Sequence, residues 1–401
     1  MKCKGLLVAI GLTLLLSGCG GGGSDRGELP PVDNVQQVEQ NEVTLDHNVM
    51  FENVRDNGLK IVVYSNGIME LTEGDVEEYL KDIDVLDDYI NQITAVELND
   101  GVSVVDEKAF VGFTHLANVK IGDSVTEIGY GAFMDCTAIT DISFGKGLRK
   151  IDDYAFSGCT GLKDAVLNEE LETLGSYVFS KCTALQNARI GSKVTEFGNS
   201  IFSECTAFTS LRCGSDVMNG AFMDCTSLES VDLDDTALVL GNRAFSGCTQ
   251  LKNVTLSQQL TEIGTYAFSG CTALQSVTIP TSVQLIDNEA FSGCTKLDTL
   301  NIVGGGELRL GDACFMGCTA LKTVTLSEGV TFIGEKAFSG CTALEKLHLP
   351  SSLEKVSYGC LEGTQSLRTI TRPGGNGKWH EVDKAKDWGR GAGTTTISKA
   401  E

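Results

Sequence analysis

The sequence predicts a solenoid of about 12 repeats of 23 residues, with a parallel β-sheet on one face and short helical or 3-10 turns on the other. The first observation is a hexapeptide close to A-F-S-G-C-T that recurs down the chain. Its cysteine stands at ten positions: 136, 159, 182, 205, 225, 248, 271, 294, 318 and 341. Seven of the nine steps between them are 23 residues, and a fixed period of this size indicates a stack of similar units.

A second observation is the local pattern within one unit, Thr249 to Cys271. Val254 and Leu256 alternate with polar neighbours, which predicts a short strand with one buried face. Gly264 is expected at a turn that needs an unusual backbone angle. The chain is then expected to enter a tight helical turn that carries Phe268.

The third observation is that eleven of the 17 phenylalanines occupy one fixed place in the repeat. One strand and one turn have too little interior to bury such a ring, so neighbouring units must stack to enclose it. About thirteen rungs at roughly 4.8 Å per rung predict a curved rod about 60 Å long, with a spine of phenylalanines inside. We expect the first strand from Ile93 to Leu98 and the closing strand from Leu367 to Ile370.

Two repeats depart from the period. The unit that ends at Cys225 is three residues short, and the unit that ends at Cys318 gains one residue near Gly304. Both changes fall in the turn between the strand and the Ala-Phe pair. We expect them to change the local curvature without breaking the stack.

The consensus of these units, L-x-x-V-x-L-P-x-x-V-x-x-I-G-x-x-A-F-x-G-C-x-x-L, resembles the BspA-type (Treponema-type) leucine-rich repeat. Ser276 to Cys294 and Leu344 to Gly359 follow it closely, and the resemblance covers about residues 93–372. It implies a leucine-rich repeat solenoid. It also implies a function in binding, since proteins of this type are associated with adhesion to host extracellular matrix and to other bacteria. That second implication is an analogy, because a shared fold does not fix a function.

The first 19 residues resemble the signal of a bacterial lipoprotein. Lys2 and Lys4 precede an apolar stretch of 12 residues from Gly5 to Leu16, and Leu16-Ser17-Gly18-Cys19 resembles a lipobox. Twelve apolar residues are too few to span a bilayer, which favours an export signal over a transmembrane helix. The resemblance implies that residues 1–18 are removed and that Cys19 is acylated, so that the lipid bilayer is one partner. An ordinary secretory signal is the alternative.

Two segments separate the anchor from the repeats. Residues 19–48 are polar and predict a flexible tether that reaches about 30 Å on average. Residues 49–92 are expected to form an N-terminal capping subdomain, with a strand at Lys60 to Tyr64 and a helix that a capping box of Thr72 and Asp75 opens. The apolar face of that helix would be Val76, Tyr79, Leu80, Ile83 and Leu86. A separate binding subdomain is the alternative.

The tail, residues 373–401, leaves the repeat pattern and holds both tryptophans, Trp379 and Trp388. It is expected to be a C-terminal cap. The alternative is a mobile recognition tail, because its glycine-rich stretches favour a loose chain.

Charge and cysteine content exclude several classes of function. The formal net charge is −23, and loss of Lys2 and Lys4 with the signal leaves 29 basic against 54 acidic residues, which disfavours nucleic acid and anionic membrane surfaces as partners. Equivalent cysteines about 4.8 Å apart hold their Cβ atoms beyond the roughly 3.8 Å of a disulfide, which predicts a ladder of buried thiols. We expect Cys213, Cys314 and Cys360 to be interior as well. A zinc site is not expected, because the cysteines form no C-x-x-C pair and no histidine accompanies them. No other metal and no cofactor are expected.

The chain is not expected to be an enzyme. It has only four histidines and no metalloprotease, nucleophile-elbow or P-loop motif. Acidic pairs such as Asp234 and Asp235 are interpreted as loop charges, and His348 as a solvated side chain on a strand.

The candidate binding surface is the outward face of the predicted strands, whose side chains are mostly small and polar. Arg189, Arg212 and Asp232 on successive rungs form its charged patch, and Asn253 and Thr255 lie on the following rung. The alternative is a solvated face without a ligand. Aromatic residues are nearly absent from it, which favours a large flat contact with a protein or a glycan over a deep pocket.

The leading hypothesis is therefore a lipid-anchored surface protein, monomeric, that acts in protein–protein interaction or adhesion to host matrix or other cells. The alternative is a periplasmic envelope scaffold or glycan-binding lipoprotein with no host role. Gly20 follows the anchor cysteine in place of the aspartate that retains enteric lipoproteins in the inner membrane. This favours the outer membrane or cell surface.

Overall fold

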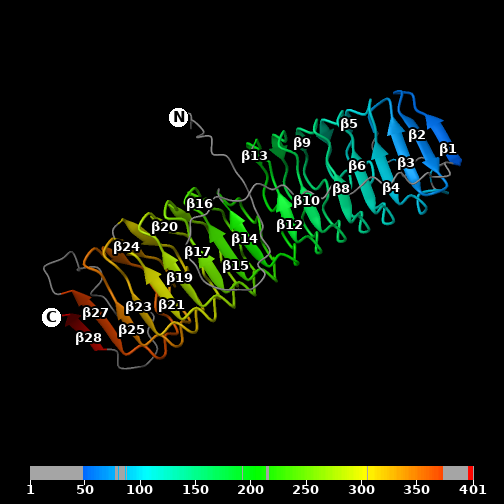
Figure 1. The fold of residues 1–401 in the computed structure, drawn as a ribbon. Helices are drawn as coiled ribbons and strands as arrows, with labels where there is room; N and C mark the ends of the chain where they lie inside the picture. Colours follow the sequence, from blue (N-terminus) through cyan, green and yellow to red (C-terminus); the bar gives the residue numbers. More distant parts are fainter. Residues whose placement is uncertain are drawn as a thin grey trace, which may run out of the picture.

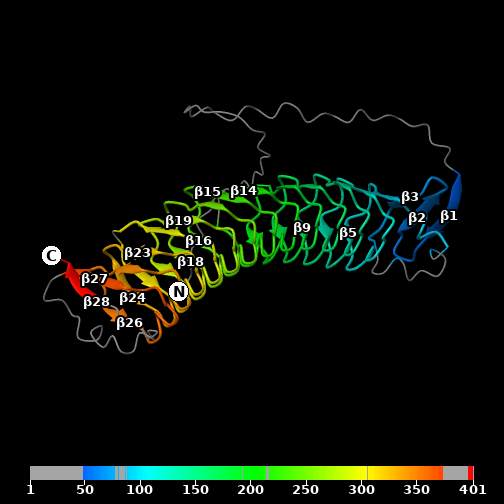
Figure 2. The ribbon, with the colours of Figure 1, turned by 90° about the horizontal axis from the view of Figure 1, so that it is seen from below.

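The computed structural model describes residues 48–76, 80, 86, 88–191, 193–213, 216–304, 306–373 and 396–400. They form an elongated, curved rod in which the strands follow one another along its length (Figures 1 and 2). In this part of the chain no helix has the length and apolar character needed to cross a bilayer. Cys19, the predicted tether, Trp379 and Trp388 lie outside the described residues.

Each rung of the rod begins with a first strand whose side chains alternate between interior and solvent. The thirteen first strands are β4 (Ala95–Leu98), β6 (Asn118–Ile121), β8 (Asp141–Ser143), β10 (Asp164–Val166), β12 (Asn187–Arg189), β14 (Ser210–Cys213), β15 (Ser230–Leu233), β17 (Asn253–Thr255), β19 (Ser276–Ile279), β21 (Thr299–Ile302), β23 (Thr323–Thr325), β25 (Lys346–His348) and β27 (Thr369–Pro373). Within each hydrogen-bonded segment, neighbouring first strands are parallel and keep the register of the repeat, so that Ser276 lies beside Thr299. The predicted solenoid with a parallel sheet along one face is confirmed.

The predicted helical face is wrong. Along the other side of the rod run second strands of two to four residues, also parallel (Figure 2). They are β5 (Val104–Val105), β7 (Glu127–Ile128), β9 (Lys150–Ile151), β11 (Thr173–Leu174), β13 (Glu196–Phe197), β16 (Val239–Leu240), β18 (Glu262–Ile263), β20 (Leu285–Ile286), β22 (Leu308–Leu310), β24 (Val330–Ile333) and β26 (Lys355–Val356). A closing turn that carries the Ala-Phe pair then leads to the next rung.

The closing turn is not helical because its backbone bonds to the neighbouring rung. The N–H groups of Tyr266, Phe268 and Gly270 donate to carbonyls of the next turn at 2.7–3.0 Å. Tyr266 and Gly270 also have positive φ angles of 58° and 73°, which a right-handed helix excludes. In each closing turn, every second N–H therefore donates to a carbonyl of the next rung, as in a ladder of parallel strands.

The predicted reason for Gly264 is also wrong. Its φ is not positive, but a Cβ added there would lie 2.8 Å from the Leu240 carbonyl oxygen and 2.9 Å from the Asn242 nitrogen. A side chain at Gly264 would therefore require the preceding rung to move, although Asp152 and Asp287 occupy the same place in other rungs. The unusual backbone angles fall instead two residues before and two residues after the phenylalanine, as at Tyr266 and Gly270.

The predicted phenylalanine spine is confirmed. Eleven rings from Phe110 to Phe338 form an unbroken stack, with neighbouring centroids 4.9–5.7 Å apart and ring planes within 16° of each other. Leu361 continues the column at the last rung and is fully buried. The stack is enclosed by leucines and β-branched residues of both strand rows, which together form one core cluster along the rod.

The repeat cysteines form a second column beside the rings. All ten are buried free thiols, and each Sγ donates to the carbonyl oxygen of the phenylalanine in the preceding rung. Cys271, for example, lies 3.2 Å from the oxygen of Phe245. Cys314 and Cys360 are buried as expected, whereas the side chain of Cys213 lies outside the described residues. Each of these carbonyls also accepts an N–H of its own turn, as Phe245 does from Cys248 at 3.2 Å, so the thiol is a second donor that links the two rungs.

Hydrogen bonding between first strands is interrupted at the shortened repeat, and also between β8 and β10 and between β17 and β19, but the stack continues. β12 and β14 are not hydrogen-bonded to each other, and the second strands fall into two blocks, one ending at β13 and one beginning with the bridge of Val217 to Leu240. The closing turns continue past this point, because the Phe202 N–H donates to the Ala221 carbonyl at 3.0 Å. At the lengthened repeat, the pairing of β22 with β24 shifts by one residue.

The segment before the repeats continues the first-strand sheet. β1 (Val49–Val54), β2 (Lys60–Tyr64) and β3 (Ile68–Thr72) form an antiparallel meander, and β3 then pairs in parallel with β4. The strand predicted at Lys60 to Tyr64 is confirmed. The capping box is wrong, because Thr72 is the last residue of β3 and the Asp75 carboxylate binds the next rung at Ser103 and Val104. Most of the predicted helix lies outside the described residues.

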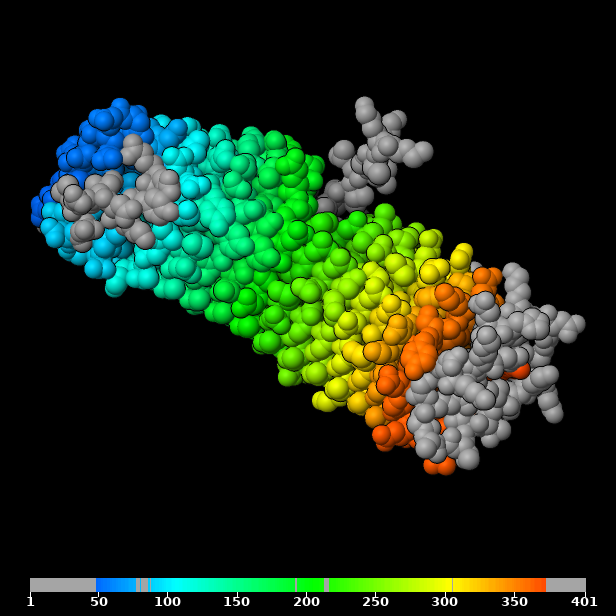
Figure 3. Space-filling model, turned by 180° about the vertical axis from the view of Figure 1, so that it is seen from behind, coloured from blue at the N-terminus to red at the C-terminus, as the bar shows by residue number. Residues whose placement is uncertain are grey.

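At the other end, β28 (Thr396–Ala400) pairs in parallel with β27 along five residues. Seen from behind, the packed rungs run from one end to the other as one continuous body (Figure 3).

Candidate functional site

The first-strand face is the row of outward side chains on the first strands. On β19 and β21 these are Ser276, Thr278, Thr299 and Asn301, all exposed, while the residues between them are buried. The same alternation recurs along the rod with mostly small polar residues. Because the strands are parallel and in register, equivalent side chains form straight rows across the rungs.

The predicted charged patch lies on this face but is divided. Arg212, Asp232 and Thr255 are register partners on β14, β15 and β17, and the Arg212 Nε lies 3.7 Å from the Asp232 carboxylate. Asn253 lies one row away, beside Ser230. These side chains therefore form one continuous group on three hydrogen-bonded strands.

Arg189 belongs to a different sheet segment. β12 pairs with β10 and not with β14, and the Arg189 guanidinium lies 3.0 Å from the Glu169 carboxylate. Both side chains of this pair are more than half exposed, so the ion pair contributes little to stability. Glu169 was missed in the sequence because it lies in the turn that follows the strand.

Charged residues also lie on the first rungs of this face, where Glu97 and Lys120 were not singled out from the sequence. Glu97, Lys120 and Asp141 line a shallow hollow of about 530 Å³ on the outer side of β4, β6 and β8, and Lys120 Nζ lies 3.2 Å from Glu97. An adjoining hollow of about 730 Å³ lies where these strands end, with Asp123 and Lys146 in its lining. Apolar and polar residues alternate within residues 95–98 and 118–121. That pattern predicts a strand in each segment and would have placed Glu97 and Lys120 on the first-strand face.

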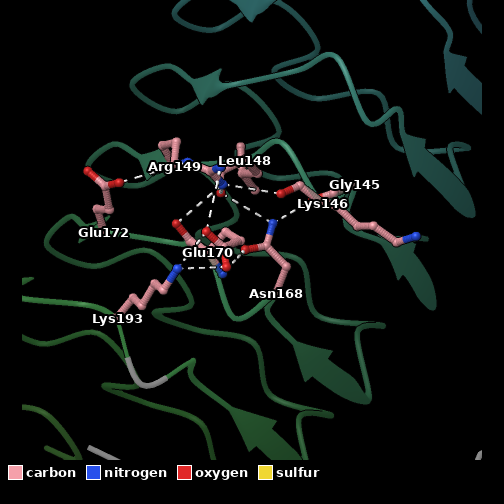
Figure 4. A network of polar contacts seen from close by, with 8 residues as sticks. All are labelled: Gly145, Lys146, Leu148, Arg149, Asn168, Glu170, Glu172 and Lys193. Atoms are coloured by element: carbon pink, nitrogen blue, oxygen red, sulfur yellow. Dashed lines mark hydrogen bonds and ion pairs between the residues drawn. The ribbon is translucent and has the colours of Figure 1, made fainter. Parts of the chain in front are cut away.

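A network beside the face ties three rungs together at the turns between first and second strands (Figure 4). The Asn168 amide donates to the carbonyls of Gly145 and Leu148, and Arg149 reaches the Glu170 carbonyl oxygen. Lys193 Nζ lies 2.7 Å from both carboxylate oxygens of Glu170 and lowers the pKa of that carboxyl by hydrogen bonding and charge. The geometry holds neighbouring turns in place, so it supports the face rather than supplying reactive groups.

The polar residues considered for catalysis have structural partners. The Asp234 carboxylate accepts from the N–H and hydroxyl of Thr236, and Asp235 accepts from the N–H of Gln258 in the next rung. His348 is half-buried and bonds to the hydroxyl of Thr371, so it is less solvated than predicted. Within the described ranges, no group of three or more His, Cys, Asp or Glu side chains is placed to hold a metal ion.

Comparison with known proteins places this geometry in a family. The model of the BspA type Leucine rich repeat region, in six copies, matches residues 88–209, 215–306 and 308–380, which is more than half of the chain. No curated protein sequence matches the chain.

Three solved structures are similar. A leucine-rich repeat protein from Bacteroides ovatus is 19% identical, with a TM-score of 0.49, 90% of this chain covered and 100% of that one. One from Eubacterium ventriosum is 20% identical, with a TM-score of 0.51 and coverage of 82% and 94%. The pneumococcal vaccine antigen PcpA is 19% identical, with a TM-score of 0.53 and coverage of 88% and 94%. At this level of identity the two structures with scores above 0.5 show a common fold and nothing finer.

Proposed function

Because the chain belongs to the BspA-type leucine-rich repeat family, we propose that it is a lipid-anchored surface protein that binds a protein partner along its first-strand face. Repeat proteins of this kind generally act in protein–protein interaction and are typically scaffolds without enzymatic activity. The anchor at Cys19, the surface location, the monomeric state and an adhesive role toward host matrix or other cells are parts of this proposal.

The observation that carries the proposal is the extent and regularity of the first-strand face. Its exposed side chains recur on every rung, and the backbone beneath them is fixed by the phenylalanine and cysteine columns. A surface that is already ordered loses little conformational entropy on binding. It is therefore suited to a partner with an extended, fairly flat surface, and the group of Arg212, Asp232 and Thr255 supplies its local charge contrast.

The arrangement of the chain supports a display role. An acylated Cys19 and a polar tether of about 30 residues would hold the rod away from the membrane by roughly 30 Å. The net charge of −23 keeps such a protein soluble and repels anionic lipid, which leaves the acyl chains as the membrane contact.

Binding of the full chain to immobilised fibronectin, laminin and collagen tests the proposal. Thr255→Trp places a bulky ring on the first-strand face, and Glu262→Trp places the same ring on the second strand of the same rung. We expect at least one matrix protein to bind, at least tenfold more weakly to Thr255→Trp and with unchanged affinity to Glu262→Trp. Binding that both variants weaken equally, or binding to none of the three proteins, would contradict the proposal.

A further inference from the structure

The closing turns carry a groove that lies apart from the first-strand face. The residue two places before the phenylalanine is left-handed in all five rungs here, with φ of 58° at Tyr177, 56° at Ser200, 62° at Gly220, 57° at Arg243 and 58° at Tyr266. The backbone is therefore alike along this row, and only the side chains differ. Ser200 and Gly220 fill so little space that a groove of about 430 Å³ opens between Tyr177 and Arg243, and Tyr266 follows Arg243 in the next rung.

One end of this closing-turn groove is the Tyr177 ring, and at the other end the Arg243 guanidinium lies over the Tyr266 ring; both rings are held in place. The Tyr177 ring stacks on Tyr154, with centroids 4.8 Å apart and planes 10° from parallel. The Tyr266 hydroxyl donates to the Glu289 carboxylate at 2.6 Å, and the Arg243 guanidinium lies 5.3 Å from the Tyr266 ring centroid. Rings fixed by their neighbours are good stacking surfaces, because little side-chain entropy is lost when a ligand binds.

Two asparagine side chains line the groove between the rings, and the Oδ1 atom of each already accepts a backbone hydrogen bond. The Asn219 Oδ1 accepts the N–H of Asn242, and the Asn242 Oδ1 accepts the N–H of Thr265, each at 2.8 Å. These bonds fix each amide and leave its NH₂ group as a hydrogen-bond donor. Both side chains are exposed, and neither NH₂ group has a protein acceptor among the described residues.

We propose that this groove binds a short neutral oligosaccharide. A sugar ring offers an apolar C–H face, which packs on an aromatic ring, and hydroxyl groups, which accept from an amide NH₂; the groove provides both. Its volume lies in the range of small-ligand sites, and four steps of about 4.8 Å give a length of about 19 Å. The groove lining holds one cation, Arg243, which already lies over the Tyr266 ring, while the chain as a whole is strongly acidic and disfavours sialylated or sulfated sugars.

The site is independent of the proposed protein-binding function. The lining residues come from the closing turns of five rungs and none lies on a first strand. The row of small residues spans the shortened repeat, where Gly220 follows the three-residue deletion. The groove is thus a property of this chain and not of the repeat consensus.

Calorimetric titration of the full chain with trisaccharides of glucose, galactose and N-acetylglucosamine tests the inference, with sialyllactose and a heparin fragment as acidic probes. Ser200→Tyr should fold, because tyrosine already occupies the same left-handed position at Tyr177, yet its ring would fill the groove. We expect a neutral probe to bind, Ser200→Tyr to abolish binding and Tyr177→Ala to weaken it at least tenfold. Tyr358→Ala, which removes an exposed tyrosine from a distant turn, should leave the affinity unchanged.

Three results would overturn the inference: no neutral probe binds, only acidic probes bind, or a folded Ser200→Tyr variant binds as tightly as the parent. The unfolding curve of each variant shows whether it is folded. If Ser200→Tyr does not fold, an unchanged affinity of Tyr177→Ala overturns the inference by itself.

Discussion

Two kinds of glycine keep each repeat in shape, and they act by different physical means. At Gly264 the neighbouring rung leaves no room for a Cβ, whereas at Gly270 the φ of 73° is unfavourable for other residues but the nearest atoms are 3.8 Å away. The row of Gly270 accepts other residues, since Lys181 and Glu204 occupy it with φ of 62° and 60°. The row of Gly264 also holds other residues, Asp152 and Asp287 among them, so the crowding at Gly264 comes from the local closeness of Leu240 and Asn242.

We therefore predict that Gly264→Ala destabilises the rod more than Gly270→Ala does. The first change forces two backbones apart and should cost about 2 kcal/mol. The second adds only left-handed strain and should cost about 1 kcal/mol. Urea unfolding midpoints of the two variants give the comparison, and Lys181→Gly, which removes such strain, should not lower the midpoint. Equal losses at both glycines would contradict this explanation.

The thiol column predicts a loss of stability in alkali. Burial raises the pKa of Cys136, Cys182, Cys294 and Cys341 to about 12, whereas an unfolded thiol has a pKa near 8.5. Above about 8.5 the unfolded chain releases these protons and the folded chain keeps them. The stabilisation is complete below that pH and is lost as the pH rises toward 12, by about 1.4 kcal/mol per thiol and pH unit.

Urea midpoints measured from pH 7 to 11 check this, with Cys294→Ala as the matched variant. The parent should lose stability more steeply than the variant, because lysine and tyrosine titration is common to both. Identical slopes would show that the thiols do not contribute.

At the scale of elements, the outward alternation of the first strands was enough to predict them, because three or four residues already show the period of two. The second strands were missed, since two residues show no period. The Ala-Phe pair suggested a helical turn, but its left-handed positions include Tyr266 and Lys336 as well as glycines, so composition does not reveal them. The patch was predicted in part. Register joins Arg212 to Asp232, whereas the strand that carries Arg189, β12, is not hydrogen-bonded to β14.

A repeated aspartate–valine pair marks the start of each block of second strands. Asp75 and Asp216 each accept backbone N–H groups of the next rung through one carboxylate oxygen, and the valine after each forms an isolated bridge to that rung. At Asp216 the donors are Leu238 and Val239, at 2.7 and 2.9 Å. Among its described residues, the rung of Asp216 has no second strand, and in that place it pairs with the next rung only through the bridge of Val217 to Leu240. The Asp216 carboxylate therefore accepts the two N–H groups that a second strand would otherwise have bonded.

We predict that Asp216→Ala destabilises the rod by about 1 kcal/mol, the usual cost of losing a capping acceptor. Hydrogen exchange provides the direct readout, because the amides of Leu238 and Val239 should exchange faster. Asp216→Asn keeps an oxygen acceptor and should remain close to the parent. If exchange at these two amides is the same in Asp216→Ala, the carboxylate does not play this part.

At the scale of the whole molecule, the columns of rings and thiols make one continuous interior that needs both neighbours at every rung. The result is a long, ordered surface on a chain of strongly negative charge, with its only predicted membrane contact at the far end of the tether. That combination suits a displayed binding protein and a periplasmic scaffold alike, and Gly20 after the anchor cysteine is the feature that favours display. Which side of the envelope the rod occupies decides between the two.

Protease treatment of intact cells that produce the full chain, followed by immunoblotting, measures this most directly. A periplasmic protein in the same cells serves as the control. Display predicts that the rod is degraded while the control survives. Full protection of the rod in cells whose surface proteins are cleaved would contradict display and, with it, a role in binding host matrix or other cells.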